Sequence, residues 1–429
     1  MHTTNTLILG AGQAGLALSH WLTVLGRDHL ILERGQVAER WHGERWDSLR
    51  LLTPNWMARL PGWSYDGPNP DGFMTAAEVA SYFDRYATSF AAPVHEHTTV
   101  QRLAADGEGF VVGTDGGEYR SSNVVIATGW CDRPAIPAAS RHVSPRIHQV
   151  IPSEYRNPDD VPPGGVLVVG ASATGVQLAD ELHRDGRHVT LAVGSHSRLP
   201  RRYRGLDIYW WLSSIGAFDK TVDDVGDVVA ARSEPSTQLV GRPDHTTIDL
   251  PTLQAQGVDL AGRLLGADGT RVFVGTDAGA VVDAADRRMR RVLARIDHAI
   301  ERLGLTSEVL DAEPLPAVSP ISAPDEFDLR DAGINTVVWA TGHRRRYEWL
   351  QLPILDGRGE IRQYRGVTPQ PGAYVLGQRF QHYRNSNFID GVGRDARFVA
   401  EQICRTNAAV DASPPAPSRR RSEVEHALR

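Results

Sequence analysis

TLILGAGQAG, residues 6–15, decides the fold of this 429-residue chain. An apolar run comes first, and glycines at positions 10, 12 and 15 follow it. The next segment is amphipathic, with Leu18, Trp21, Leu22 and Leu25 on one side. This order predicts a strand, a tight turn and a helix. Glycines let such a turn approach a pyrophosphate, which binds to unpaired N–H groups at the helix N-terminus.

An acidic residue stands where a dinucleotide-binding unit holds a ribose. Glu33 ends the next apolar run, residues 29–32. A carboxylate there accepts hydrogen bonds from the adenosine ribose and repels a 2′-phosphate. This pattern is typical of FAD or NAD, and we assign the first unit to FAD.

A second glycine-rich loop, GASATG at residues 170–175, follows the apolar run 166–169, about 160 residues after the first. Ser172 replaces its middle glycine, and no acid follows its next strand, residues 188–193. Ser195 and the arginines 198, 201, 202 and 204 come instead. Hydroxyls and guanidinium groups suit the 2′-phosphate of NADP. We therefore predict NADPH at this loop, although these arginines could also form a solvated face.

Composition narrows the class of protein. The chain is 41% hydrophobic and carries a net charge of −6, which gives no basic excess for nucleic acid. No apolar run approaches the length of a membrane span, and the first strand begins too close to Met1 to leave room for a signal peptide. Only Cys131 and Cys404 are present, so no disulfide framework is expected, nor is a metal-ligand cluster evident. These features predict a cytoplasmic enzyme, and a homodimer is compatible with them.

The layout of the chain looks nested. Ala-Thr-Gly turns at 127–129 and 340–342 each follow an apolar run and mark equivalent segments of two units. The predicted fold is α/β, with two Rossmann-like dinucleotide-binding domains and the NADPH domain inserted in the FAD domain. The boundaries follow from linker composition: 1–160 is the first part of the FAD domain and 161–320 the NADPH domain. Residues 321–410 complete the NADPH domain and return to the FAD domain, and the Pro-, Ser- and Arg-rich residues 411–429 form a disordered tail.

The motifs between the loops resemble those of class B flavoprotein monooxygenases. This group holds flavin-containing, Baeyer–Villiger and indole-pyruvate monooxygenases, and the resemblance is strongest to a bacterial branch of FAD-dependent oxidoreductases. It covers nearly all of residues 5–405 and rests on both loops, both Ala-Thr-Gly turns, and segments 40–55, 147–158, 199–205 and 391–396.

Two departures from the family pattern stand out. Val143-Ser144-Pro145 replaces a Phe-x-Gly, which puts any gating role of the nearby His148 in doubt. The second Ala-Thr-Gly turn continues as HRRR, residues 343–346, where the family has a tyrosine and soon an aspartate. This basic run indicates either an anionic substrate or a plain surface cluster.

The resemblance implies an FAD-containing, NADPH- and O2-dependent monooxygenase. Such an enzyme forms a flavin C4a-(hydro)peroxide and transfers one oxygen atom to a small organic substrate by S-, N- or Baeyer–Villiger oxygenation. The alternative is an NADPH-dependent flavin reductase, dehydrogenase or oxidase without oxygen transfer. A non-enzymatic redox-sensing regulator would bind NADPH without turnover.

The resemblance also implies site residues. Asn55 is the candidate catalytic donor beside the flavin, and its alternative is a turn residue following Pro54. The N-terminus of the last helix, near Gly391, is expected to point at the flavin pyrimidine. The full set of predicted cofactor-binding residues is Gly10, Gly12, Gln13, Ala14, Gly15, Glu33, Arg34, Arg40, Trp41, Thr53, Asn55, Thr128, Gly129, Gly170, Ser172, Thr174, Gly175, Ser195, Arg198, Arg201, Thr341, Gly342 and Gly391.

Overall fold

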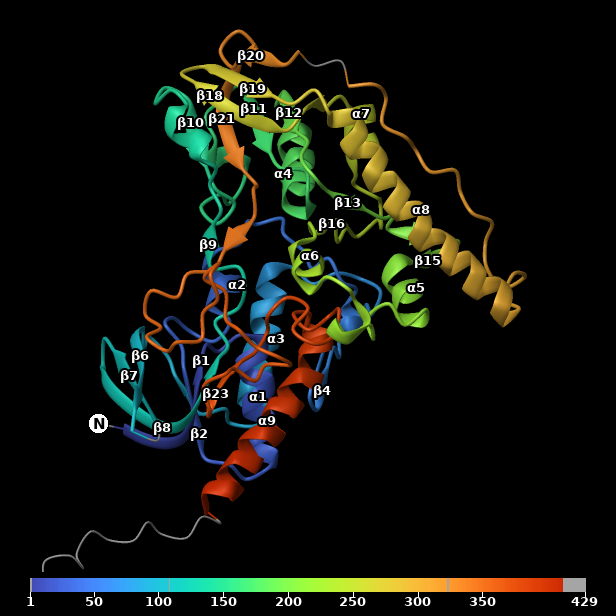
Figure 1. Ribbon diagram of the computed structural model, residues 1–429. Coiled ribbons are helices and arrows are strands. Elements are labelled where there is room, and N and C mark those ends of the chain that lie inside the picture. Colours follow the sequence, from blue (N-terminus) through green and yellow to red (C-terminus); the bar gives the residue numbers. More distant parts are fainter. Residues whose placement is uncertain (1, 108, 322–323, 412–429) are drawn as a thin grey trace, which may run out of the picture.

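Two α/β domains, joined by a narrow connection, make up the computed structural model, which describes residues 2–107, 109–321 and 324–411 (Figure 1). The first domain contains both the start of the chain and its last helix. The second domain lies in the upper part of Figure 1 and consists of the middle of the chain. The chain therefore adopts the predicted arrangement, in which one dinucleotide-binding domain is inserted into the other.

The first domain is built on a seven-stranded sheet in the order β5-β2-β1-β8-β7-β6, with β23 pairing to β8. Its strands are β1 (His2–Leu9), β2 (His29–Leu32), β5 (Val94–His95), β6 (Val100–Asp106), β7 (Gly109–Thr114), β8 (Gly117–Ile126) and β23 (Ala373–Val375). The pairs β1–β2, β1–β8 and β8–β23 are parallel, so their carboxyl ends lie at one edge of the sheet. The first glycine loop is at this edge.

The second domain repeats this plan with a five-stranded parallel sheet in the order β10-β21-β11-β12-β17. Its strands are β10 (His148–Val150), β11 (Gly165–Val169), β12 (Val189–Ala192), β17 (Asp259–Ala261) and β21 (Ile334–Trp339). Helix α4 (Ala173–Arg184) follows β11 as α1 (Gln13–Val24) follows β1. A three-stranded antiparallel sheet, β18 (Leu264–Asp268), β19 (Arg271–Val274) and β20 (Glu326–Asp328), extends this domain.

The other helices are α2 (Glu39–Gly43), α3 (Ala76–Ser89), α5 (Ile208–Ser214), α6 (Val228–Ser233), α7 (Leu250–Gln256), α8 (Ala278–Leu303) and α9 (Ile389–Asp411), with short 3₁₀ turns η1 (Asn55–Met57), η2 (Ala138–His142), η3 (Pro158–Asp160) and η4 (Val222–Asp224). Short two-stranded pairs are β3 (Arg59–Leu60) with β4 (Trp63–Ser64), β13 (Ser197–Arg198) with β16 (Thr237–Gln238), and β14 (Arg202–Tyr203) with β15 (Leu206–Asp207).

The chain passes between the domains through two antiparallel strands, β9 (Arg133–Pro134) and β22 (His343–Arg344). His343 pairs with Pro134, and Arg344 pairs with Arg133. We call these four residues the hinge ribbon. The outgoing and returning strands therefore form one connection.

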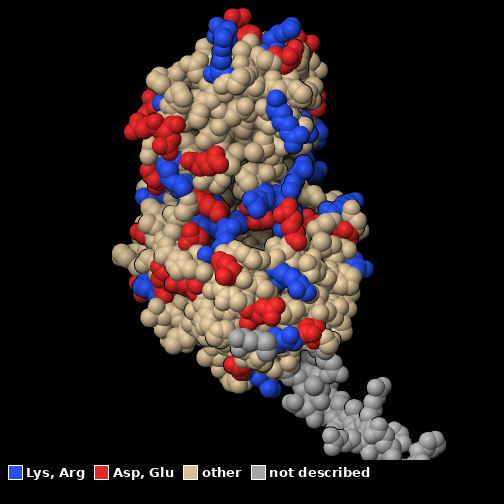
Figure 2. All heavy atoms as spheres, turned by 90° about the vertical axis from the view of Figure 1, so that its left-hand side faces the viewer, with Lys and Arg blue, Asp and Glu red and all other residues tan. Residues whose placement is uncertain are grey.

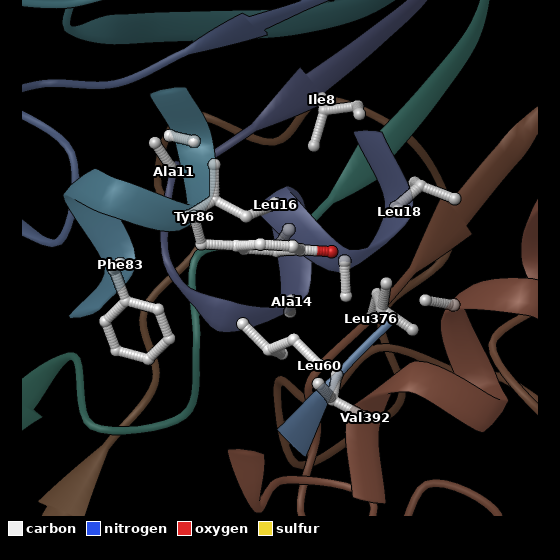
Figure 3. Close-up of a cluster of buried hydrophobic side chains, with 14 of the residues drawn as sticks. Ile8, Ala11, Ala14, Leu16, Leu18, Leu60, Phe83, Tyr86, Leu376 and Val392 are labelled. Atoms are coloured by element: carbon white, nitrogen blue, oxygen red, sulfur yellow. The ribbon is translucent and has the colours of Figure 1, made fainter. Parts of the chain in front are cut away.

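The larger core cluster of the first domain lies between its sheet and helices α1, α3 and α9 (Figure 3), and a second cluster includes Leu7, Phe110 and Leu350. Ile8 comes from β1, Leu16 and Leu18 from α1, Phe83 and Tyr86 from α3, and all are buried. Val392 brings the start of α9 into the same cluster. Because α9 packs on α1, the last helix is fixed beside the first glycine loop.

One domain boundary in the structure differs from the prediction. The first domain was predicted to extend to residue 160, but β10, within that range, pairs with β21 of the second sheet. Val143 also bridges to Gly269 of the second domain. The second domain therefore begins directly after the hinge ribbon, and the Pro-rich segment 158–163 is a loop inside it. The predicted tail comprises residues 411–429. Residues 412–429 lie outside the described residues, and Asp411 is the last residue of α9.

Candidate functional site

Close backbone packing explains two glycines of the first loop. A Cβ on Gly10, whose φ is +110°, would lie 2.7 Å from the carbonyl oxygen of Ala127. A Cβ on Gly15 would overlap the carbonyl oxygen of Gly10. Gly12 instead faces open space at the N-terminus of α1. The loop thus leaves room beside Gly12, where unpaired N–H groups can receive a phosphate.

The second loop has the same construction. Gly170 has the same φ of +110° and faces the carbonyl oxygen of Ala340, while Gly175 packs on Gly170. Each loop therefore packs against the Ala-Thr-Gly turn of its own domain. Ser172 occupies the open middle position as N-cap of α4, and its hydroxyl makes no capping hydrogen bond. A serine hydroxyl that makes no capping bond stays available to a phosphate at the N-terminus of α4.

Glu33 ties its strand end to the first glycine loop. One carboxylate oxygen accepts a 2.7 Å hydrogen bond from Ala11 N, and the other accepts a 3.2 Å bond from Gly35 N. Glu33 is buried, so it stabilises the loop from within. Each oxygen keeps a further lone pair, which leaves the predicted ribose contact open.

The start of α9 lies at the start of α1. Gln13 Nε2 donates to the carbonyl oxygen of Asn387, just before α9. Gly391 packs on the backbone of Asn385, where a Cβ would overlap its carbonyl oxygen, and Gly377 lies against the methyl group of Ala14. The N-termini of two helices, each a source of partial positive charge, are thereby brought together.

Asn55 is buried in a loop that it holds together. Its Oδ1 accepts a 2.7 Å hydrogen bond from Met74 N, and its Nδ2 donates a 2.9 Å bond to Asn69 O. These contacts favour the structural alternative, a loop residue following Pro54. One Nδ2 hydrogen is left for another acceptor, so the catalytic role of Asn55 stays a prediction.

The remaining predicted residues of the first domain lie around the carboxyl edge of its sheet. Arg40 makes an ion pair of 3.3 Å with Asp132, and Arg34 one of 2.8 Å with Glu44. Trp41 packs against the cores of both domains. Thr53, Thr128 and Gly129 are half-buried on the adjoining loops, as is Thr174 in the second domain.

Thr341 and Gly342 both form hydrogen bonds next to the hinge ribbon. The Thr341 hydroxyl donates to the carbonyl oxygen of Ala135 at 2.9 Å, and Gly342 O accepts a bond of the same length from Ala135 N. These contacts hold the two connecting strands together. They give Thr341 and Gly342 a structural role in addition to the predicted cofactor contact.

Arg198 lies in the interior of the second domain, so its assignment to the 2′-phosphate is wrong. Its guanidinium forms 2.7 Å ion pairs with both Asp249 and Asp286 and donates to Pro316 O at 3.0 Å. The side chain is only 2% exposed. Two carboxylates already neutralise this cation, so it has no capacity for a phosphate.

Arg201 is likewise taken by contacts within the protein. It donates to both carboxylate oxygens of Asp207 and donates a 2.7 Å hydrogen bond to Leu52 O of the first domain. Its guanidinium lies between the rings of Phe73 and Tyr209. Arg201 therefore joins the two domains, and the prediction that it binds NADPH is also wrong.

Arg263, which the sequence pattern did not single out, replaces these two arginines as the candidate. It follows β17, the neighbour of β12, and donates a 2.8 Å hydrogen bond from Nη2 to Ser195 Oγ. Arg263 is exposed and makes no ion pair among the described residues. Its only signal in the sequence was a position at the carboxyl end of a short apolar strand.

The basic run 343–346 is mostly neutralised. Arg345 pairs with Glu360 and donates to Gln378, and Arg346 pairs with Glu348. The surface-cluster alternative therefore fits these two residues. Burial lowers the pKa of His343, with the charges of Arg45 and Arg40 acting in the same direction.

Two adjoining cavities lie where α5 meets the first domain. The larger, about 420 Å³, is lined by Trp56, Arg59, Pro70, Asp71, Trp210, Ser213 and Ser214. The smaller, about 250 Å³, shares Arg59 and Ser213 with it and reaches Asn385, Asp390 and Arg394 at the start of α9. Their arginines are paired, Arg59 with Asp390 and Arg394 with Asp219. The larger cavity thus presents two tryptophans, a paired arginine and the carboxylate of Asp71, which makes no ion pair among the described residues.

A separate hollow is visible between the domains on another face of the molecule, with basic and acidic side chains at its rim (Figure 2). Over the described residues, no group of three or more His, Cys, Asp or Glu side chains is arranged to hold a metal ion. Within the same ranges, no helix has the length and hydropathy needed to cross a membrane.

Comparison with known proteins places this architecture in a family. A CzcO-like oxidoreductase of Geobacillus kaustophilus is 31% identical over 94% of this chain and 99% of its own. The chain belongs to the CzcO-like oxidoreductases. The family model described as pyridine nucleotide-disulphide oxidoreductase matches residues 7–208. The protein is accordingly an enzyme of the oxidoreductase class.

Two monooxygenases extend the comparison. A probable indole-3-pyruvate monooxygenase of Arabidopsis thaliana, YUCCA1, is 32% identical over 47% of this chain and 50% of its own. A flavin-containing monooxygenase from Stenotrophomonas maltophilia shares the fold, with a TM-score of 0.64 at 19% identity over 94% of this chain and 99% of its own. The predicted likeness to class B flavoprotein monooxygenases is confirmed.

Proposed function

We propose that this oxidoreductase binds FAD in the first domain and NADPH in the second and acts as a monooxygenase on a small organic substrate. The observation that carries the proposal is the duplicated glycine loop, each copy packed on its own Ala-Thr-Gly turn. Two equivalent sites on facing domains allow electrons to pass from one dinucleotide to the other. Names of the relatives support the same pairing, since they include flavin-containing and pyridine nucleotide enzymes.

The first site fits FAD. The open position at Gly12 can receive the diphosphate, and the buried Glu33 carboxylate can accept from the adenosine ribose. Farther along the same edge, the start of α9 at Gly391 offers a helix N-terminus, whose partial positive charge stabilises an anionic flavin ring.

The second site fits NADPH. Ser172 and the N-terminus of α4 can hold the diphosphate. Arg263 and Ser195, hydrogen-bonded to each other at the carboxyl ends of adjacent strands, can hold the 2′-phosphate. An exposed guanidinium without a carboxylate partner among the described residues is available for this contact.

Bound flavin supplies hydride acceptance and oxygen activation, and the protein orients the partners and excludes water. Asn55 and Arg201 serve that task by fixing the loop 51–74. Asn55 closes the loop on itself, and Arg201 anchors its Leu52 carbonyl to the second domain. The remaining Nδ2 hydrogen of Asn55 is our candidate donor to the reacting edge of the flavin.

The tryptophan-lined cavity is our candidate entrance for substrate. Trp56 follows Asn55 directly, and Trp210 faces it from α5 of the second domain. Arg59 is neutralised by Asp390 and Asp71 adds a carboxylate, so the cavity disfavours an anion, while its two tryptophans favour an apolar molecule. The proposal covers transfer of oxygen to a sulfur, a nitrogen or a carbonyl carbon of the substrate.

Reaction with oxygen distinguishes a monooxygenase from a reductase or oxidase. Enzyme reduced by NADPH is mixed rapidly with O2 while the flavin absorbance is followed. A monooxygenase is expected to reoxidise in two resolved phases when NADP⁺ is present, because it shelters an oxygenated flavin. A single phase, with stoichiometric hydrogen peroxide under all conditions, would instead establish the reductase or oxidase alternative.

A further inference from the structure

One carboxylate at the tryptophan-lined cavity is left without a cation among the described residues. Three aspartates and two arginines line this cavity and the smaller one that adjoins it. Arg59 pairs with Asp390 at 2.6 Å, and Arg394 pairs with Asp219 at 2.8 Å. Asp71 is exposed and makes no ion pair within the described part of the chain. The two cavities together therefore carry one uncompensated negative charge.

Backbone hydrogen bonds fix Asp71 beside the first tryptophan. Trp56 N donates to Pro70 O at 2.9 Å, and Asn55 N donates to Gly72 O at 2.8 Å. Asp71 stands between Pro70 and Gly72 in the chain, so its backbone is held against residues 55 and 56. The Asn55 side chain closes the same loop from within. The carboxylate and the indole consequently belong to one side of the cavity.

The second tryptophan comes from α5 of the other domain, where its neighbours are well fixed. Asp207, the N-cap of α5, accepts a 2.8 Å hydrogen bond from Tyr209 N. Trp211 is buried and donates from Nε1 to Tyr203 O at 2.7 Å. The ring of Trp210 lies edge-on to that of Trp211, with 4.8 Å between the ring centroids, and its side of the cavity is 41% exposed. An indole on a firmly placed helix therefore lines the cavity from the second domain.

These groups suit a cation better than an anion. The face of an indole ring attracts a positive charge, and a carboxylate adds a Coulomb attraction. Among the described residues, Arg59 is the only cation that lines the larger cavity, and Asp390 neutralises it. Its guanidinium carbon lies 5.9 Å from the ring of Trp56, so that indole already makes one cation–π contact. The ring of Trp210 makes no such contact within the described ranges and is open to a ligand.

We propose that the tryptophan-lined cavity binds a substrate that carries a positively charged group, held at the entrance by Asp71 and the ring of Trp210. The charged group is a recognition element, such as a quaternary ammonium, whose nitrogen has no lone pair and cannot itself be oxygenated. The assignment rests on the proposed function, which makes this cavity the entrance for substrate. It is the opposite of the anionic substrate that the basic run 343–346 had suggested as one alternative.

The test uses three phenols that differ only in the group opposite the hydroxyl, which is trimethylammonium, tert-butyl or sulfonate. All three groups are tetrahedral and similar in size, so the compounds differ mainly in charge. Calorimetric titration of the flavin-containing protein gives each Kd without turnover. Wild type is expected to bind the trimethylammonium phenol about tenfold more tightly than the sulfonate.

Two variants locate the charge preference. Asp71→Asn keeps the shape of the side chain and removes its charge, so it is expected to weaken binding of the trimethylammonium phenol about threefold. The same variant should bind the sulfonate more tightly and the tert-butyl phenol with unchanged Kd. Trp210→Leu keeps an apolar side chain without an aromatic face, so it should weaken the cation about threefold and the tert-butyl phenol less.

Asp331→Asn is the matched control, because Asp331 is also exposed and makes no ion pair among the described residues. It lies beyond β20 in the second domain and should leave all three Kd values unchanged. An equal change of the trimethylammonium Kd in Asp331→Asn would assign the preference to the net charge of the protein and overturn the cation site. Tighter binding of the sulfonate than of the trimethylammonium phenol by wild type would overturn it as well.

The oxygen reaction of the wild type decides the proposed function separately. Reoxidation in one phase, together with a charge preference that depends on Asp71, supports the cation site and overturns the monooxygenase. Reoxidation in two phases, together with equal binding of the trimethylammonium and sulfonate phenols, overturns the cation site and leaves the monooxygenase standing.

Discussion

Gln13 and Asn387 are joined by a 2.8 Å hydrogen bond across 374 positions of sequence. Gln13 opens the first helix after the glycine loop, and Asn387 lies two residues before the start of the last helix. A side-chain amide therefore links the two helix N-termini that converge on the proposed flavin site. Farther along the same helix, Trp21 Nε1 donates to Gly393 O at 3.2 Å.

Gln13→Leu is expected to loosen this arrangement while preserving side-chain volume. One net hydrogen bond is worth about 0.5–1.5 kcal/mol, so a modest fall in Tm is expected. Flavin should dissociate faster, because α9 is less firmly placed. Flavin fluorescence after dilution measures the release, and Trp21→Phe, which removes a bond farther from the loop, is the control. Equal release rates for Gln13→Leu and wild type would show that the amide does not position the site.

Alanine at Gly12 and at Gly15 should produce opposite effects. The methyl group at Gly15 overlaps the carbonyl oxygen of Gly10, and overpacking of this kind typically costs about 1–3 kcal/mol or more. Gly15→Ala should therefore lower the Tm of flavin-free protein. Gly12→Ala has open space and should keep that Tm but lose flavin affinity. Denaturation and flavin titration of both variants check the pair, and a reversed pattern would contradict the phosphate position.

Arg263→Ala should raise the Kd of NADPH without a similar effect on that of NADH. A charge-assisted contact to phosphate is worth about 1.5–3 kcal/mol, which is roughly tenfold to more than hundredfold in affinity. Arg198→Ala is the comparison: it leaves Asp249 and Asp286 buried without their cation, so it should lower Tm instead. Equal losses of NADPH and NADH affinity in Arg263→Ala would remove Arg263 from the 2′-phosphate.

Asp395 in α9 should make stability depend on pH. Burial raises its pKa to about 6, while Ser386 and the charges of Arg394 and Arg365 act in the opposite direction. The folded protein thus holds a proton that the unfolded chain has lost above its usual acid pKa, so stability falls as pH rises toward 6. Asp395→Asn should remove this penalty. Its Tm relative to wild type should increase between pH 4.5 and pH 7, and a constant difference would contradict the assignment.

The fold could be predicted because its signals are local. Each glycine loop, the strand before it and the helix after it are adjacent in sequence, and the duplicated Ala-Thr-Gly turns confirmed the repeat. The domain boundary was missed because β10 is recognised only by its pairing with β21, residues 336–338. The sequence near residue 148 carries no signal for pairing with β21.

The arginines of the second domain show why site residues are harder to predict. Arg198 stands at the expected position after β12, but its partners are 51 and 88 positions away. A sequence pattern gives the position of a charge along the chain and says nothing of the carboxylate that folding brings to it. Arg263 was overlooked for the converse reason, since its neighbour Ser195 is 68 positions earlier.

The hinge ribbon has a mechanical consequence. Its two strands are paired to each other and carry the whole covalent connection between the domains. A two-stranded ribbon twists readily, whereas pulling its strands apart breaks their hydrogen bonds. Torsion about the ribbon axis therefore leaves the covalent link intact, so the relative orientation of the domains is set by their non-covalent contacts, among them Arg201 with Leu52 and Trp41 with both cores.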